Sequence, residues 1–255
     1  MGVENDGNGN IIVIASSGID KRIRIYKIDP LQMSWELLSV LGNAEMLKID
    51  PAIEKVKDKW FITITSIEGT ANNPDPNMEN GTYNVEIYSS GNLIDWERLS
   101  TIISRKSNIE DSRLYYSNRL NKFLFLFEQE DYDKGPSSLK MIESGDMGET
   151  WTNEQFVLKA IADSEPAGMF EIGGSLYVFF SSDIDNPGKS YEGGNAFYLY
   201  SKNGLNSWSS INKVELGDSI LLIDVIMAGN KMYFAAFRNY LTSRQMMLFN
   251  GILTY

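Results

Sequence analysis

Short segments in which apolar and polar residues alternate recur along the chain and predict β-strands. Successive side chains of a strand point to opposite faces, so this alternation is typical of a strand that is half-buried. Each segment precedes a tryptophan, and another strand-like segment follows that tryptophan. The alternating segments are RIRIYKI (22–28), YNVEIYSS (83–90), SLKMIES (138–144) and FYLYSK (197–202), and the tryptophans are Trp35, Trp96, Trp151 and Trp208.

A second series of segments is apolar at nearly every position and lies out of phase with the first. Such dense runs are typical of strands that are buried on both faces. Five of them predict five repeats, and repeats of roughly 50–60 residues with four strands each are typical of β-propeller blades. The dense runs are NIIVIASS (10–17), KWFITITS (59–66), KFLFLFEQ (122–129), SLYVFFSS (175–182) and KMYFAAFR (231–238).

The sequence therefore predicts an all-β fold, a five-bladed β-propeller of four-stranded antiparallel blades that forms one domain over residues 1–255. The first and last repeats are short, and we expect GILTY (251–255) to supply a strand that closes the ring by pairing with the other terminus. The predicted blades span about 1–45, 46–105, 106–160, 161–217 and 218–255.

One turn before a tryptophan has a distinctive composition. SGDMGETW (144–151) matches in full the Asp-box, Ser-x-Asp-x-Gly-x-x-Trp, of sialidases and related propellers, and three partial copies end at the other tryptophans. Gly148 permits a positive φ angle, and Ser144 and Asp146 can bond backbone groups of the turn. We expect Trp151 to pack between blades, so this resemblance implies a structural role and not a catalytic one.

Composition narrows the chemistry that is available. The chain has a formal net charge of −11, no cysteine and no histidine. The negative charge disfavours nucleic acid as a partner, and no apolar run reaches the length of about 18 residues that a membrane span needs. Without histidine a Ser-His-Asp triad is excluded, so any catalysis depends on carboxylates, tyrosine, lysine or arginine.

Acidic residues recur 14 to 16 positions after each tryptophan, where the innermost strand of the next blade is expected to begin. They are Asp50, Asp111, Glu165 and Asp224. Because innermost strands line the central tunnel, these carboxyl groups are expected to meet at its mouth and to perturb one another's pKa. The alternative is that each acid only bonds the backbone of its loop, which is the preferred role for Asp224 in its apolar surroundings.

Three long loops, at 67–82, 128–138 and 182–195, are rich in glycine, proline, asparagine and aspartate. All three are expected on the same face as the acids, in the blades of Asp50, Asp111 and Glu165. Long loops on a rigid scaffold commonly carry binding sites. Tyr132 and Tyr191, which lie in two of these loops, are therefore candidate substrate-binding residues.

The order Asp-Pro, Asp and Glu-Pro in consecutive blades resembles the five-bladed glycoside hydrolases of families 43 and 32. The segments that carry the resemblance are IDPAIEKVKDKWFITITS and SEPAGMFEIGGSLYVFFSS. It implies that Asp50 is the general base or nucleophile, that Asp111 orients the acid and tunes its pKa, and that Glu165 is the general acid. Two carboxyl groups, one protonated and one ionised, suffice for glycoside hydrolysis without histidine.

Further candidates are less specific. Arg113, Arg238 and Asp224 lie near inner-strand positions and are candidate substrate-binding residues, although the simpler role for Arg113 is an ion pair with its acidic neighbours. DGNGN (6–10) and DIDNP (183–187) resemble fragments of calcium loops but lack the distal glutamate, so hairpin turns are the preferred interpretation and no metal or cofactor is assigned.

The sequence thus favours a glycoside hydrolase that acts on a glycan or oligosaccharide. The alternative is a non-catalytic carbohydrate-binding propeller, either lectin-like or from a phage receptor-binding protein, and a third reading is a propeller that binds other proteins. The expected setting is extracellular, periplasmic or on a virion surface, and the oligomeric state is left open.

Overall fold

A computed structural model describes residues 1–42, 45–68, 81–132, 134–189, 194–202, 204–228 and 231–252. Within these ranges the chain is built from β-strands joined by turns, and no helix there is long and apolar enough to cross a membrane. The strands are β1 (Gly2–Asn5), β2 (Ile11–Ser16), β3 (Ile23–Asp29), β4 (Ser34–Leu41), β5 (Leu47–Val56), β6 (Lys59–Glu68), β7 (Thr82–Ser90), β8 (Glu97–Arg105), β9 (Asn108–Ser117), β10 (Lys122–Glu130), β11 (Ser138–Ser144), β12 (Thr152–Leu158), β13 (Ser164–Ile172), β14 (Ser175–Ser182), β15 (Asn195–Ser201), β16 (Asn212–Lys213), β17 (Ile220–Ala228), β18 (Lys231–Arg238) and β19 (Gln245–Ile252).

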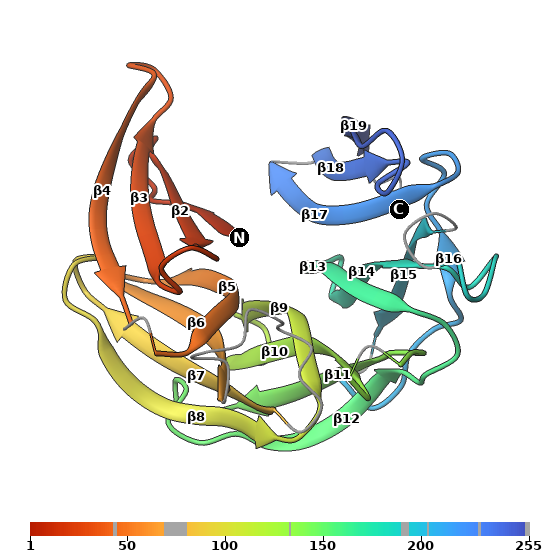
Figure 1. Cartoon of the computed structure of the whole chain (residues 1–255), viewed down its shortest axis with the longest axis horizontal. Coiled ribbons are helices and arrows are strands. Elements are labelled where there is room, and N and C mark those ends of the chain that lie inside the picture. Colours follow the sequence, from red (N-terminus) through yellow and green to blue (C-terminus); the bar gives the residue numbers. More distant parts are fainter. Residues whose placement is uncertain are drawn as a thin grey trace.

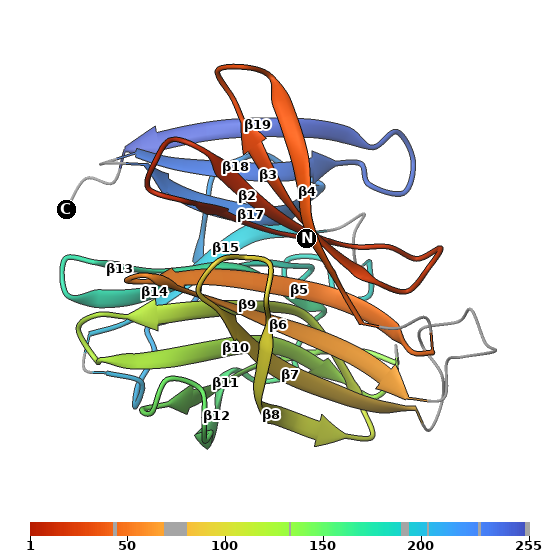
Figure 2. The same ribbon diagram turned by 90° about the vertical axis from the view of Figure 1, so that its left-hand side faces the viewer.

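The strands form five antiparallel sheets in sequence order, β1–β4, β5–β8, β9–β12, β13–β16 and β17–β19. The sheets are arranged around a centre, and β5, β9, β13 and β17 are the strands of their sheets that lie nearest to it (Figure 1). Within one sheet the strands rotate progressively, as β5 to β8 show in Figure 2, which is the ordinary twist of a blade. The five-bladed all-β propeller predicted from the sequence is confirmed, with three strands in the described part of the fifth blade.

The dense apolar runs form the second strand of each blade. In β10 the side chains of Phe123, Phe125 and Phe127 pack towards the second sheet, whereas Leu124 and Leu126 pack towards the fourth. Both faces of this strand are therefore buried, and all five side chains are fully inaccessible to solvent. This two-sided burial is the reason why the run is apolar at every position.

Each pair of successive sheets encloses its own apolar cluster. Four such clusters occupy the spaces between sheets one and two, two and three, three and four, and four and five. The two end sheets differ from the others, because their second strands bury only alternate residues. Figure 1 shows the first and last sheets standing apart. Among the described residues β1 pairs only with β2, and Gly251 and Ile252 of the predicted closing strand pair with β18; residues 253–255 of that strand lie outside the described residues.

The burial of each tryptophan depends on whether its sheet has a preceding sheet to pack against. Trp96, Trp151 and Trp208 each pack on the cluster between their own sheet and the preceding one. Trp35 belongs to the first sheet and is 68% exposed, with an edge-on contact to Tyr26. The first sheet lacks a packed predecessor within the described residues, so the partner that buries the other three tryptophans is missing.

The turn at 144–151 is held by its own side chains. Ser144 Oγ donates to Asp146 Oδ1 (2.8 Å) and accepts the Gly148 N–H (2.9 Å), while Asp146 Oδ1 accepts the Thr150 N–H (2.9 Å). Trp151 Nε1 donates to the Gly148 carbonyl oxygen (3.2 Å). Gly148 has φ of 95°, the left-handed conformation expected from the sequence.

The turn before Trp96 repeats this arrangement with other residues. Ser90 Oγ donates to Asn92 Oδ1 (3.1 Å) and accepts the Leu93 N–H (2.9 Å), and Trp96 Nε1 donates to the Leu93 carbonyl oxygen (3.2 Å). Asn92 thus takes the position of the aspartate, because an amide oxygen accepts the same backbone bonds as a carboxylate.

Candidate functional site

A β-bulge interrupts the innermost strand in each of the last four blades. The strand pairing skips between Ile49 and Ala52 in β5, opposite Phe127 in β9, between Pro166 and Gly168 in β13, and between Leu222 and Asp224 in β17. Bulges redirect side chains and are common beside active sites. The four bulges therefore set where the side chains at the inner edges of the blades point.

Asp50 and Asp111 occupy equivalent positions in two of these bulges. Both have positive φ angles, 44° and 46°, a conformation that aspartate tolerates better than most residues. The Asp111 N–H donates to Asp50 Oδ2 (3.0 Å), and Ser112 Oγ donates to the Asp50 carbonyl oxygen (3.2 Å). The two bulges are thereby joined across the second and third blades.

Three carboxyl groups meet beside this link. Asp111, Glu128 and Glu165 each place one carboxylate oxygen so that all three atoms lie within 4.8 Å of one another. Glu128 comes from the end of β10 and is only 8% exposed, whereas Asp111 and Glu165 are half-buried on β9 and β13. The predicted meeting of Asp111 and Glu165 is thus observed, and Glu128, from the strand next to β9, adds a third carboxyl group.

Burial and repulsion between charges raise the pKa values of Asp111 and Glu128, and burial raises that of Asp50. Burial raises the pKa of Asp111 to about 7, with a further contribution from the charge of Asp50. Burial raises the pKa of Glu128 well above its ordinary value, and the charges of Glu165 and Asp111 add to the effect. The pKa of Asp50 is also raised by burial, although the bond from the Asp111 N–H opposes this. Carboxyl groups this close share protons at neutral pH instead of ionising together.

Arg113 fastens the inner strands of three blades. Its Nη1 donates to the Ser112 carbonyl oxygen (2.9 Å), its Nε to Ala167 (3.1 Å) and its Nη2 to Ile223 (2.5 Å). All three acceptors belong to bulges, where carbonyl groups are released from the strand ladder and need partners. The ion pair expected for Arg113 is wrong for the described residues, because its guanidinium group bonds backbone carbonyl groups instead. Its positive charge nevertheless opposes the rise in the pKa of Asp111.

The other acid of the predicted series, Asp224, is not one of the three clustered acids. Asp224 lines a cavity of about 640 Å³ along the central axis, together with residues from all five innermost strands. Its Oδ1 accepts the Val225 N–H (2.8 Å), and burial raises its pKa. Asp224 pairs with Ala235 just after its bulge, whereas Asp50 and Asp111 lie within theirs. Equal spacing from the tryptophans therefore hides different positions on the strands.

The remaining candidates lie away from the carboxyl cluster or outside the described residues. Arg238 donates from Nη2 to the Leu216 carbonyl oxygen (3.4 Å) at the end of the fifth sheet. Tyr132 donates its hydroxyl to the Gly81 carbonyl oxygen (3.0 Å), which joins the loops of two neighbouring blades. Tyr191 lies outside the residues that the structure describes.

The cluster of Asp111, Glu128 and Glu165 has the chemistry to bind a divalent cation, since carboxylate oxygens are preferred ligands of Ca²⁺ and Mg²⁺. The two calcium-like fragments act differently. Asp6 Oδ1 accepts the N–H groups of Asn8 and Asn10 (2.7 and 3.0 Å), and Asp183 accepts those of Asp163 and Lys189 (3.0 and 2.9 Å). These carboxylates hold turns together, as the hairpin interpretation expects.

Glu128 is the member of the cluster that the sequence interpretation missed. It follows the five apolar residues 123–127, where a charged residue is unexpected, and this interruption was the available signal. A buried ionisable side chain at the end of an apolar strand is expensive unless it has a function or a partner.

Comparisons with known proteins find solved structures of similar fold. No protein-family model and no curated protein matches the chain. Among solved structures, a family 43 β-1,3-galactosidase aligns with 15% identity and a TM-score of 0.67, covering 98% of this chain and 55% of its own. An α-L-arabinofuranosidase from Lactobacillus brevis aligns with 14% identity and a TM-score of 0.66, covering 97% and 88%. An α-L-arabinanase from Penicillium chrysogenum, complexed with arabinobiose, aligns with 11% identity and a TM-score of 0.70, covering 94% and 77%.

The protein thus has the five-bladed propeller fold, and solved structures of family 43 glycosidases are similar to it. The chain spans little more than half the length of the galactosidase and most of the length of the other two enzymes. At these identities the likeness concerns the fold.

Proposed function

We propose that this protein is a carbohydrate-active propeller that hydrolyses glycosidic bonds with the carboxyl groups of Asp50, Asp111 and Glu165. The observation that carries the proposal is the convergence of Asp111, Glu128 and Glu165 within 4.8 Å, next to the Asp50–Asp111 link. The likeness to structures of family 43 glycosidases supports the same class of reaction.

In the proposed mechanism Glu165 is the general acid that protonates the leaving oxygen. One of its carboxylate oxygens lies within 4.8 Å of an oxygen of Asp111 and of an oxygen of Glu128. Asp50 acts either as the general base that takes a proton from the attacking water, or as the nucleophile that attacks the anomeric carbon and forms a glycosyl-enzyme that water then hydrolyses. Charge that develops on the oxocarbenium-like sugar in the transition state is stabilised by the ionised carboxylate.

Asp111 and Glu128 act as positioning residues in this proposal. The backbone N–H of Asp111 holds the Asp50 carboxylate at 3.0 Å. Glu128 is the most deeply buried of the three clustered acids. Burial, together with the charges of Glu165 and Asp111, raises its pKa and so favours its protonated form. A protonated Glu128 can donate a hydrogen bond to an ionised neighbour and so keep one proton within the cluster.

The substrate class follows from chemistry and from the similar structures. An oligosaccharide presents the acetal bond that a carboxyl pair can cleave. The similar structures include a β-1,3-galactosidase and an arabinanase bound to arabinobiose. Galacto- and arabino-oligosaccharides are therefore the first substrates to test, and an extracellular, periplasmic or virion-surface setting would supply such glycans.

A non-catalytic glycan-binding propeller is the second candidate. The observation that favours it is the use of Asp50 and Arg113 within the fold. One oxygen of Asp50 already accepts a backbone N–H, and Arg113 bonds three backbone carbonyl groups. Both residues would then hold the bulges of the propeller in place.

The experiment compares the wild type with Glu165→Gln on β-1,3-linked galacto-oligosaccharides and arabino-oligosaccharides. Product release is followed by mass spectrometry and binding by calorimetry. Loss of a general acid is expected to lower the rate by about 10²–10⁴-fold while binding persists. Glu171→Gln is the matched control, because Glu171 lies on the same strand but bonds to Ser117 and Arg119. Binding without product release by the wild type would favour the second candidate. Equal rates in the wild type and in Glu165→Gln would refute the proposed role of Glu165.

A further inference from the structure

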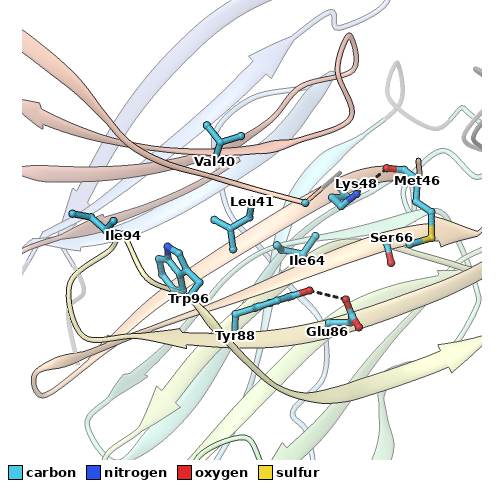
Figure 3. A pocket seen from close by; sticks show the side chains of 11 residues that line it. Val40, Leu41, Met46, Lys48, Ile64, Ser66, Glu86, Tyr88, Ile94 and Trp96 are labelled. Carbon is cyan, nitrogen blue, oxygen red and sulfur yellow. Dashed lines mark hydrogen bonds between the residues drawn. The ribbon is translucent and has the colours of Figure 1, made fainter. Parts of the chain in front are cut away.

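A groove between the first and second blades lies apart from the carboxyl cluster. It has a volume of about 370 Å³ and lies against β4, β5, β6 and β7. Figure 3 shows aromatic side chains at one end and polar side chains at the other. The residues that define its chemistry are Trp96, Tyr88, Ile64, Ser66, Lys48 and Glu86.

The aromatic end offers ring surface to the groove. Trp96 Nε1 already donates to Ser39 Oγ and to the Leu93 carbonyl oxygen, both at 3.2 Å. The Tyr88 hydroxyl donates to Glu86 Oε2 (2.8 Å). Because the polar atoms of both rings are bonded to the protein, their apolar carbon surface is what remains for a ligand.

The polar end places opposite charges on β5 and β7, the two strands that flank β6. Lys48 is only 8% exposed, and its Nζ donates to the Met46 carbonyl oxygen (3.0 Å). Burial lowers the pKa of Lys48. Gly42 keeps this arrangement possible, since a side chain there would collide with the lysine and its φ of 83° also favours glycine. An ammonium group at this depth gains from every oxygen ligand that enters beside it.

Glu86 completes the polar end. Its Oε1 accepts from Arg98 Nε (2.5 Å), while Oε2 accepts from Tyr88. A carboxylate oxygen has two lone pairs and can accept a further hydroxyl group. The groove therefore combines a hydrogen-bond donor, an acceptor and an aromatic platform within one small volume.

We propose that this groove is a second glycan-binding site, distinct from the carboxyl cluster, that holds one or two sugar rings. The hydroxyl groups of the sugar would accept from Lys48 Nζ and donate to Glu86, while its carbon-bound hydrogens pack on Trp96. The volume lies in the range of ligand pockets, roughly 300–1,000 Å³. The choice of a glycan as ligand rests on the proposed carbohydrate activity, whereas the site itself rests on the groove.

The test observes Trp96 directly. Nuclear magnetic resonance follows the five indole N–H signals during titration with β-1,3-galactotriose and with arabinobiose, and Trp96→Phe assigns the relevant signal. We expect this signal to shift saturably in the millimolar range, equally in the wild type and in Glu165→Gln. Lys48→Met should raise the dissociation constant by about tenfold, as expected for the loss of a charged hydrogen bond. Tyr88→Phe, which preserves the ring, should raise the dissociation constant by about threefold.

Lys213→Met is the matched control, because Lys213 lies on β16 and pairs with Asp185. An unchanged Trp96 signal with both sugars, or equal affinity in folded Lys48→Met, would overturn the proposal. A saturable Trp96 shift in a protein that releases no sugar would support this site and reject hydrolysis. Hydrolysis without any Trp96 shift would retain the proposed function and reject the groove.

Discussion

The space between blades two and three is filled, whereas the space between blades one and two is partly open. In the filled seam Phe123 lies at the centre of an aromatic group, with ring centroids 4.8 Å from Phe61, 5.2 Å from Tyr116 and 6.5 Å from Trp151. In the open seam isoleucines pack the inner part, and a groove of about 370 Å³ remains beyond them.

This difference teaches that repetition specifies the strands and turns of a propeller without specifying how its seams are filled. In the turns before both Trp96 and Trp151, a serine hydroxyl accepts a backbone N–H and the indole donates to the carbonyl oxygen three residues earlier. The side chains between them differ, because Lys48, Ser66 and Glu86 stand on the open seam. A repeat can thus preserve its architecture while one seam acquires polar groups that can bind a ligand.

Replacing the central ring of the filled seam should have the largest effect. Phe123→Ala is expected to lower the free energy of unfolding by about 4 kcal/mol, because it leaves a cavity among rings that cannot collapse. Leu41→Ala, at the open groove, should cost about 1 kcal/mol, since Leu41 is already half-exposed. Urea unfolding of both variants measures the difference. Equal losses would show that the two seams are filled alike.

Raising the pH should lower the unfolding free energy by a few kcal/mol, through two acids at the inner edge of the filled seam. Burial raises the pKa of Asp111 to about 7, and burial and the charge of Glu4 raise that of Glu54 to about 8. Groups whose pKa is raised by folding stabilise the fold below their ordinary pKa, and this contribution is lost as the pH rises through the folded value. The unfolding free energy should therefore fall between about pH 4, near the ordinary values of these groups, and about pH 8.

Glu54→Gln tests the contribution of one group, because Glu54 Oε1 accepts the Tyr116 N–H across this seam (3.2 Å). The variant should be more stable than the wild type at high pH and should show a flatter dependence. Glu154→Gln is the control: bonds from Arg105 lower the pKa of Glu154 to about 2, so its removal leaves the slope above pH 5 unchanged. A wild type whose stability rises over this range would contradict the expectation.

Shortening the tryptophans should separate the filled seam from the unpacked edge of the first blade. Trp151→Phe is expected to cost about 2 kcal/mol, because Trp151 packs on Phe123 and Phe125. Trp35→Phe should change stability by less than about 0.5 kcal/mol, since Trp35 is 68% exposed. Thermal unfolding compares the two. A large loss in Trp35→Phe would mean that this tryptophan is buried in solution.

Removing one hydroxyl from each turn should have the smallest and most similar effects. Ser144→Ala and Ser90→Ala are each expected to cost about 1 kcal/mol, because each buried hydroxyl accepts from backbone N–H groups of its turn, one in the case of Ser144 and two in the case of Ser90. Ser34→Ala, at an exposed position, is the control. Unequal losses in the two turns, measured by urea unfolding, would show that their shared geometry does not imply shared energetics.

The local parts of the structure could be read from the sequence. Phe123 to Phe127 form an uninterrupted apolar run, and burial on both faces demands such a run wherever a blade has two neighbours. The turn at 144–151 contains both partners of each of its main hydrogen bonds within eight residues. Short-range patterns such as these record their own structural cause.

The position of the acids depended on features that the sequence does not display. Asp50 and Asp111 lie within bulges, and Asp224 lies just beyond one, although all three follow a tryptophan at similar spacing. A bulge arises from the pairing of two strands, so a count along one strand misses it.

The sequence by itself determined the class of the fold, the strand periodicity, the turns and the absence of histidine and cysteine chemistry. Only the tertiary structure decided that Glu128 joins Asp111 and Glu165, that Arg113 bonds three bulges, and that one seam stays open beside Lys48. Each of these depends on groups from different strands or blades meeting in space. Such meetings are set by packing and bulge geometry, which act across distances that no local pattern encodes.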